Sequence, residues 1–159
     1  MEKQDRPLSS RNIRIIFLIL TFFPVIYLIL LFVFSSTETE TSPDPTFDTI
    51  LPIGWAIISV VDILLAFFIF LPKFNALMQK DATMRNAREA FSHLMIVSTL
   101  LEAIGVFGLI IGIMQIFVTG TFAFPIPSLF IVISFLFCLY IYMTYVPRLT
   151  SMIDQAMGM

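Results

Sequence analysis

Two carboxylic acids lie inside long apolar segments of the chain. Asp62 falls within residues 50–71 and Glu102 within residues 94–118, and neither segment contains a Lys or Arg to neutralise them. Keeping an ionisable group at bilayer depth costs free energy, so such a group is a functional-site hypothesis by default. The chemistry open to these acids is reversible binding of a proton or of Na⁺.

Counting along the chain places both acids at a similar depth. Asp62 lies eleven residues before Lys73, and Glu102 lies nine residues after His93. At about 1.5 Å of rise per helical residue, both acids are roughly 13–17 Å from the same boundary. If the two helices are antiparallel neighbours, the acids can face each other. Two facing carboxylates repel in a low dielectric, and we expect such a pair to retain at least one proton at neutral pH.

Two readings of these acids follow from the residues around them. In the first, Ser59 and Ser98 lie about one turn from the acids and, with backbone carbonyls, could complete an oxygen shell for Na⁺. In the second, each protonated acid only donates a hydrogen bond that stabilises a helix contact. Tyr27 also lies deep in an apolar segment and needs a partner for its hydroxyl.

Small residues accompany both acids at helical spacing. After Glu102, the small residues on the same helix face are Gly105, Gly108 and Gly112. The last two form a small-xxx-small pair, which lets another helix approach closely. On the other segment, Ser59, Asp62 and Ala66 form a matching stripe. We predict that the two helices meet through Asp62, Ala66, Glu102 and Gly105.

The composition identifies the solvent of these helices as lipid. Hydrophobic residues make up 58% of the 159 residues, charged residues 13%, and the mean hydropathy is +0.97. A soluble domain of this size would not have such a composition. Four apolar runs are long enough to cross a bilayer: Ile15–Phe34, Ile50–Leu71, Leu94–Val118 and Ile126–Val146. The sequence predicts an all-α, polytopic membrane protein with four transmembrane helices in one bundle, a single domain over residues 1–159.

Prolines mark several predicted helix ends. Pro52 lies at the start of the second span, and Pro72 lies at its end. Pro125 and Pro127 precede the fourth span, and Pro147 follows it. In the first span, Pro24 predicts a kink.

The basic residues predict the orientation of the chain. All nine lie before the first span, between the second and third, or after the fourth. By the positive-inside rule, both termini and the 73–93 loop are therefore expected in the cytoplasm. Apolar residues recur at helical spacing within that loop, which predicts that the second and third helices extend into a short hairpin. The acidic segment 35–49 is expected outside, as a solvated connector.

One helix resembles a known family. The run from Leu101 through Glu102, Ala103 and Phe107 to Gly112 is similar to the carboxylate helix of rotary-ATPase proteolipid subunits. The resemblance implies that Glu102 carries a proton or Na⁺. The same run also resembles small bacterial four-span membrane proteins, whose final span ends in Pro-Arg as at Pro147 and Arg148 here.

Two functional hypotheses remain open at this point. One is a small bundle that binds or translocates protons or Na⁺ through Asp62 and Glu102, as a homo-oligomer. The other is a non-catalytic accessory subunit of a larger membrane complex. The sequence contains no enzymatic triad, nucleotide-binding loop, Cys/His metal cluster or nucleic-acid signature, so we expect no enzyme activity, cofactor, metal or nucleic-acid partner.

Overall fold

The computed structural model describes residues 9–35, 49–119 and 125–158, and these form an all-α bundle. Four helical stretches are long and apolar enough to cross a membrane: Ser10–Phe34, Leu51–Met78, Met84–Val118 and Ile126–Ala156. The four predicted spans are thus confirmed. The acidic segment predicted to lie outside, with Glu38, Glu40, Asp44 and Asp48, falls outside the described residues except at its margins.

Several of these stretches are divided by local changes in helix geometry. The first is a single helix, α1 (Ser10–Ser35). The second comprises α2 (Leu51–Leu64), the π-helical turn η2 (Leu65–Phe70) and α3 (Leu71–Met78). The third comprises α4 (Met84–Met114) and η3 (Gln115–Thr119), and the fourth comprises α5 (Pro125–Thr144) and α6 (Val146–Ala156).

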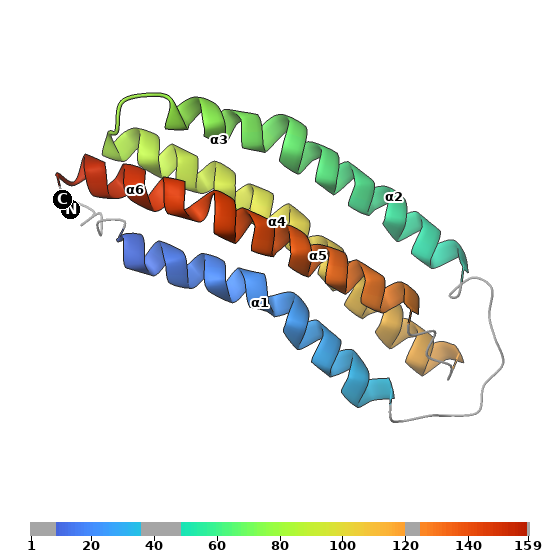
Figure 1. Ribbon diagram of the computed structural model, residues 1–159. Coiled ribbons are helices and arrows are strands. Elements are labelled where there is room, and N and C mark those ends of the chain that lie inside the picture. The colour runs from blue at the N-terminus through green and yellow to red at the C-terminus, as the bar shows by residue number, and fades with distance from the viewer. Residues whose placement is uncertain (1–8, 36–48, 120–124, 159) are drawn as a thin grey trace, which may run out of the picture.

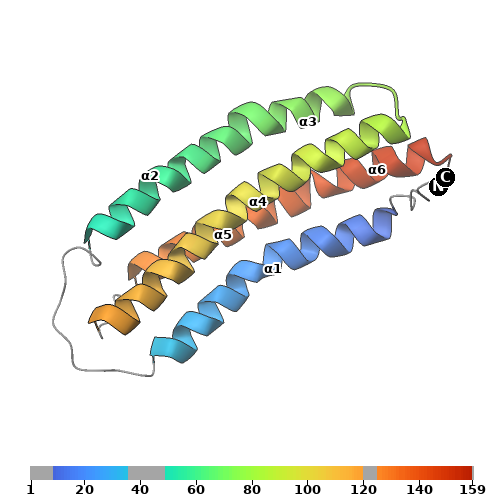
Figure 2. The ribbon, with the colours of Figure 1, turned by 180° about the vertical axis from the view of Figure 1, so that it is seen from behind.

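The central helices of the bundle are α4 and the α5–α6 stretch. In Figure 1, α5 and α6 run alongside α4, with α2–α3 on one flank and α1 on the other. From behind, α4 lies between α2–α3 and α1 (Figure 2). The most extensive packing is between α4 and α5; α1 packs on both of them, whereas α2 packs mainly on α4. The second and third spans are antiparallel neighbours, as a short hairpin requires.

Two prolines that were expected to end spans lie instead at internal junctions. Pro72 and Pro147 each occupy the first turn of a further helix, α3 and α6. A proline is tolerated there because its missing N–H would have no partner in a first turn. Before Pro72 the helix widens into η2, and before Pro147 it turns at Tyr145, whose N–H still reaches the carbonyl of Ile141 at 2.9 Å. The apolar spans predicted to end at Leu71 and Val146 are therefore followed by further helix, which was expected after Leu71 but not after Val146.

Pro24 lies inside α1, which continues through it from Ser10 to Ser35. A proline within a helix lacks one backbone donor and crowds the preceding turn, which bends the helix. In Figure 1, α1 changes direction near its middle. The picture therefore agrees with the kink predicted from the sequence.

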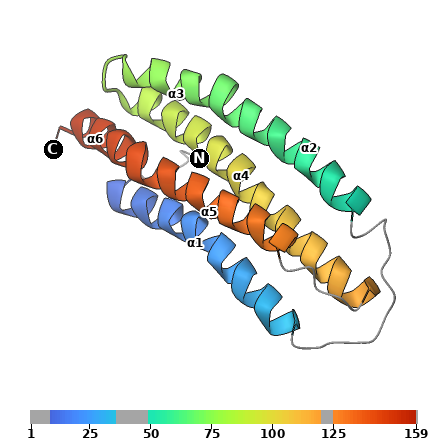
Figure 3. The same cartoon turned by 45° about the vertical axis from the view of Figure 1, so that its right-hand side comes forward.

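The predicted hairpin joins α3 to α4 over only five residues, Gln79–Thr83. Thr83 is the N-cap of α4, and its hydroxyl accepts a hydrogen bond from the N–H of Asn86 at 3.3 Å. The same end of the bundle contains α6 and the start of α1, as Figure 3 also shows. There the hydroxyl of Ser10 donates to Asp154, and Arg14 Nη2 donates to Thr150 Oγ1 at 3.3 Å. All the basic residues that the structure describes lie toward this end, which we call the basic end.

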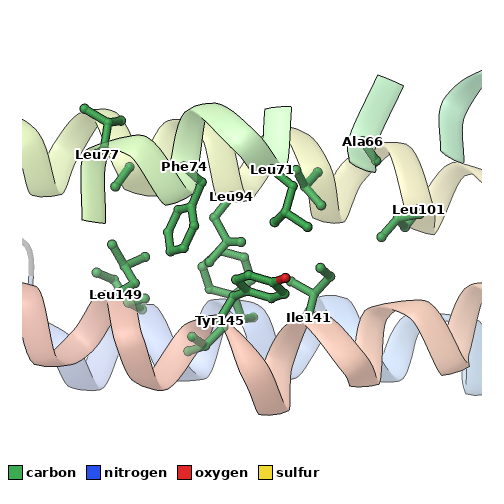
Figure 4. Close-up of a cluster of buried hydrophobic side chains, with 14 of the residues drawn as sticks. Ala66, Leu71, Phe74, Leu77, Leu94, Leu101, Ile141, Tyr145 and Leu149 are labelled. Atoms are coloured by element: carbon green, nitrogen blue, oxygen red, sulfur yellow. The ribbon is translucent and has the colours of Figure 1, made fainter. Parts of the chain in front are cut away.

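A hydrophobic core fills the bundle near the basic end. Phe74 of α3 is fully buried, and its ring meets the ring of Tyr145 edge to face, with centroids 5.7 Å apart. Figure 4 shows Leu71 and Leu77 on one side of the cluster, with Ile141 and Leu149 on the other. The core thus joins α3 to α6 and α5 and holds the hairpin against the rest of the bundle.

Candidate functional site

Glu102 projects from α4 toward α1, where it has a specific partner. The hydroxyl of Tyr27 on α1 donates a hydrogen bond to Glu102 Oε1. Both side chains are half-buried. The Tyr27 ring stacks on the ring of Phe23 one turn earlier, with centroids 6.4 Å apart and planes 14° from parallel. The phenol is therefore held on the α4-facing side of α1.

α5 completes this junction through Ser134. The Ser134 side chain is fully buried, and its hydroxyl donates to the carbonyl oxygen of Leu101 at 2.8 Å, with the carbonyl oxygen of Glu102 at 3.5 Å. Cys138, one turn further along α5, is also buried. The polar groups of three helices thus meet beside Glu102.

Gly105 makes the close contact at this junction possible. A Cβ atom added at Gly105 would lie 3.0 Å from Ser134 Oγ and 3.4 Å from Cδ2 of Tyr27. These are tight contacts with both neighbouring helices. The absence of a side chain at Gly105 therefore lets α1 and α5 approach α4 next to Glu102.

Gly108 and Gly112 extend the same face of α4 away from the basic end. A Cβ atom at Gly108 would lie 2.5 Å from the backbone oxygen of Pro127 on α5. A Cβ atom at Gly112 would lie 2.5 Å from Cδ2 of Leu31 on α1. The small-xxx-small pair therefore packs against α5 and α1, and not against α2.

Asp62 occupies a different position from Glu102. It lies on α2, is half-buried, and makes no hydrogen bond or ion pair with any residue that the structure describes. The structure therefore shows no hydrogen-bonded pair of the two acids. α2 and α4 pack together as predicted, but Gly105 packs against α1 and α5 instead. Ala66 is fully buried and belongs to the surface that packs on α4.

Glu102 and Asp62 have different surroundings because of the way in which α4 is rotated about its axis. The α2–α4 contact is made by apolar and aromatic groups, such as the rings of Trp55 and Phe107, which stack with centroids 4.5 Å apart. A tyrosine hydroxyl is available on the α1 side of α4, and a buried carboxyl group is stable only where it is hydrogen-bonded. Glu102 accordingly faces Tyr27.

The two serines proposed as ion ligands are both buried, and neither hydrogen-bonds to Asp62 or Glu102. Ser59 is 6% exposed, and its Oγ has no hydrogen-bond partner. It lines an apolar groove of about 360 Å³ between α2 and α5. Ser98 is 2% exposed and lies one turn before Glu102 on α4. Within residues 9–35, 49–119 and 125–158, no three or more His, Cys, Asp or Glu residues gather in a way that could hold a metal ion.

Sequence reasoning noted the depth of Tyr27 but not its partner, and it missed Ser134. The available signal for Ser134 was a single serine within the apolar run Ile131–Leu139. Such a residue at bilayer depth commonly hydrogen-bonds to a neighbouring helix.

The fold and this junction define a four-span helical membrane protein. No family model, curated protein or solved structure matches the chain.

Proposed function

We propose that this protein is a non-catalytic membrane subunit that associates with a second copy of itself through α2. The observation that carries the proposal is the environment of Asp62. It is an ionisable group near the middle of a candidate span, and the described part of its own chain offers it no hydrogen-bond partner. In hydrocarbon, such a group is expected to face a protein neighbour that can satisfy it.

The exposure of α2 supports an interface on this helix. In the span Leu51–Met78, only 11% of an 18-residue apolar stretch is buried, against 44% of the corresponding stretch in Met84–Val118. Beside Asp62, the side chains of Ile58 and Val61 are 42% and 47% exposed. Asp62 therefore lies at the edge of the α4 contact, next to an apolar surface that another helix could cover.

A second copy is a suitable neighbour because symmetric pairing is the commonest way in which a chain associates with itself. A twofold contact between two α2 helices would bring the two Asp62 carboxyls close together. One carboxyl, if protonated, could then donate a hydrogen bond to the carboxylate of the other, which satisfies both groups without a positive charge.

Disulfide crosslinking in native membranes tests this proposal. In a Cys138→Ala background, which removes the only native thiol, Ile58→Cys should form a disulfide-linked dimer. The matched control is Ile19→Cys on α1, which is 50% exposed and should not crosslink. Absence of an Ile58 crosslink, together with a monomer mass in mild detergent, would overturn the proposal. Co-purification of an unrelated subunit would favour the accessory-subunit alternative.

Substitution of Asp62 separates an interface from a lipid-facing position. Asp62→Asn retains a hydrogen-bonding side chain and should preserve the dimer. Asp62→Leu removes it and should weaken the dimer. If Asp62 faces lipid instead, Asp62→Leu should leave the oligomeric mass unchanged and make the protein more stable, because a buried carboxyl is costly in hydrocarbon.

Proton binding at Glu102 is a second candidate function. It is favoured by the Tyr27–Glu102 hydrogen bond at mid-span and by the resemblance of this helix to proteolipid subunits. A hydrophobic carbodiimide reacts with protonated carboxyls from the lipid phase, so it should label Glu102 at neutral pH and should not label that position in Glu102→Gln. If Glu102 is not labelled, and Glu102→Gln leaves reconstituted H⁺ and Na⁺ fluxes unchanged, this candidate is excluded.

A further inference from the structure

A concave surface of about 490 Å³ lies at the basic end of the bundle, between the α3–α4 turn and α6. Its charged lining residues are Lys80 from the turn and Arg148 from the first turn of α6. Ser151 and Gln155 contribute a hydroxyl and an amide, and none of the acidic residues that the structure describes lines the pocket. The volume lies in the range typical of small-molecule sites. This combination is suited to a small anion or to an anionic part of a larger molecule.

Arg148 is positioned by contacts that leave its charge available. Its Nη1 donates to Asn75 Oδ1 at 3.4 Å, and its guanidinium carbon lies 5.9 Å from the centre of the Tyr145 ring. Neither partner carries a negative charge at neutral pH, so the contacts orient the guanidinium without neutralising it. A planar guanidinium presents paired N–H donors that match the oxygens of a phosphate group.

Lys80 adds a second positive charge from a distant part of the sequence. Asp81, its neighbour in the chain, is exposed and does not line the pocket. The two cations can therefore act on one anion held between the turn and α6.

Part of the remaining lining is apolar and lies at the end of a candidate span, where lipid headgroups are expected. Met78, which is the last residue of the second candidate span, contributes an apolar wall together with Met152. A site that combines cations, a hydroxyl and an apolar wall at the end of a membrane span suits an amphiphile with a phosphate headgroup.

We propose that this pocket binds a phosphate group through Lys80 and Arg148. An anionic phospholipid is the source that the apolar wall favours, and free phosphate is the other source of the same chemistry. Each basic residue next to an anionic lipid contributes about fivefold in binding. Loss of both should therefore reduce the preference for anionic lipid roughly 25-fold, and the preference should weaken as salt is raised.

The test compares the full chain in phosphatidylcholine nanodiscs with and without phosphatidylglycerol. Native mass spectrometry measures the lipid that each protein retains, and thermal unfolding measures the stabilisation. The wild type should retain phosphatidylglycerol selectively and unfold at a higher temperature in its presence. Lys80→Gln combined with Arg148→Gln should lose both effects. The matched control is Arg11→Gln combined with Arg85→Gln, which removes the same charge from exposed positions at the same end and should behave like the wild type.

A third variant tests the proposal independently, in case the double variant misfolds. Ser151→Asp leaves both cations and their contacts in place but puts a negative charge in the pocket, and it should also abolish the preference. Equal losses in the control and the double variant would overturn the proposal, because they would indicate general surface charge. Retention of the preference in Ser151→Asp would also overturn it. If inorganic phosphate raises the unfolding temperature of the wild type but phosphatidylglycerol does not, phosphate recognition is supported and the lipid source is overturned.

Discussion

The hydroxyl of Tyr27 on α1 donates a hydrogen bond to the carboxylate of Glu102 on α4, across 75 residues of sequence. This bond connects an outer helix of the bundle to a central one. It also gives the carboxyl of Glu102 a hydrogen-bond partner near the middle of a candidate span. The partner is a neutral phenol, so the contact does not depend on a second charged residue.

Tyr27→Phe should reduce the free energy of unfolding by roughly 0.5–2 kcal/mol, because it removes the donor and leaves the Glu102 carboxyl without this bond. Unfolding in mixed detergent micelles measures the loss. The matched control is Tyr142→Phe, which also deletes a phenol hydroxyl, although Tyr142 makes no hydrogen bond with any described residue. A loss for Tyr27→Phe no larger than that for Tyr142→Phe would show that the bond contributes nothing to stability.

Alanine substitutions at glycines should affect stability in a graded order. Gly108→Ala should be the most damaging, by about 1–3 kcal/mol, because its Cβ would collide with the backbone oxygen of Pro127. Gly112→Ala should cost less, because the colliding group is the end of the flexible Leu31 side chain. Gly54→Ala is the control, since nothing lies within 4 Å of its added Cβ. Equal stability of the Gly108 and Gly54 variants would contradict the close α4–α5 contact.

We expect the basic end of the bundle to lie on the cytoplasmic side of the membrane. Reporter proteins fused at the N terminus, in the turn Gln79–Thr83 and at the C terminus should all report the cytoplasm, and a reporter within residues 36–48 should report the opposite side. A cytoplasmic signal from residues 36–48 would reverse this orientation. A signal from the turn on the opposite side to both termini would contradict the packing of α3 on α6.

The sequence by itself determined the class of this protein and the identity of its spans. Hydropathy identifies segments that are stable in lipid, and the outer limits of the four spans agree with the structure to within one residue, at Phe34, Leu51, Val118 and Ile126. It also determined that Asp62 and Glu102 lie deep in neighbouring antiparallel helices, because depth depends only on counting residues along a helix. Apolar residues at helical spacing after Pro72 predicted that the second helix continues, and α3 confirms it. Continuation of the fourth helix beyond Pro147 was not predicted, since a proline is compatible with either an end or a new first turn.

Only the tertiary structure decided which way each acid faces. In a soluble helix, the polar face reveals the rotation, but here the lipid-facing and core-facing residues are both apolar, so the pattern around the helix carries little information. Rotation was determined instead by close packing at Gly108 and Gly112 and by the hydrogen bonds of Glu102 with Tyr27 and of Ser134 with Leu101. These contacts join α4 to α1 and α5, so Glu102 faces α1 while Asp62 remains on the weakly enclosed α2.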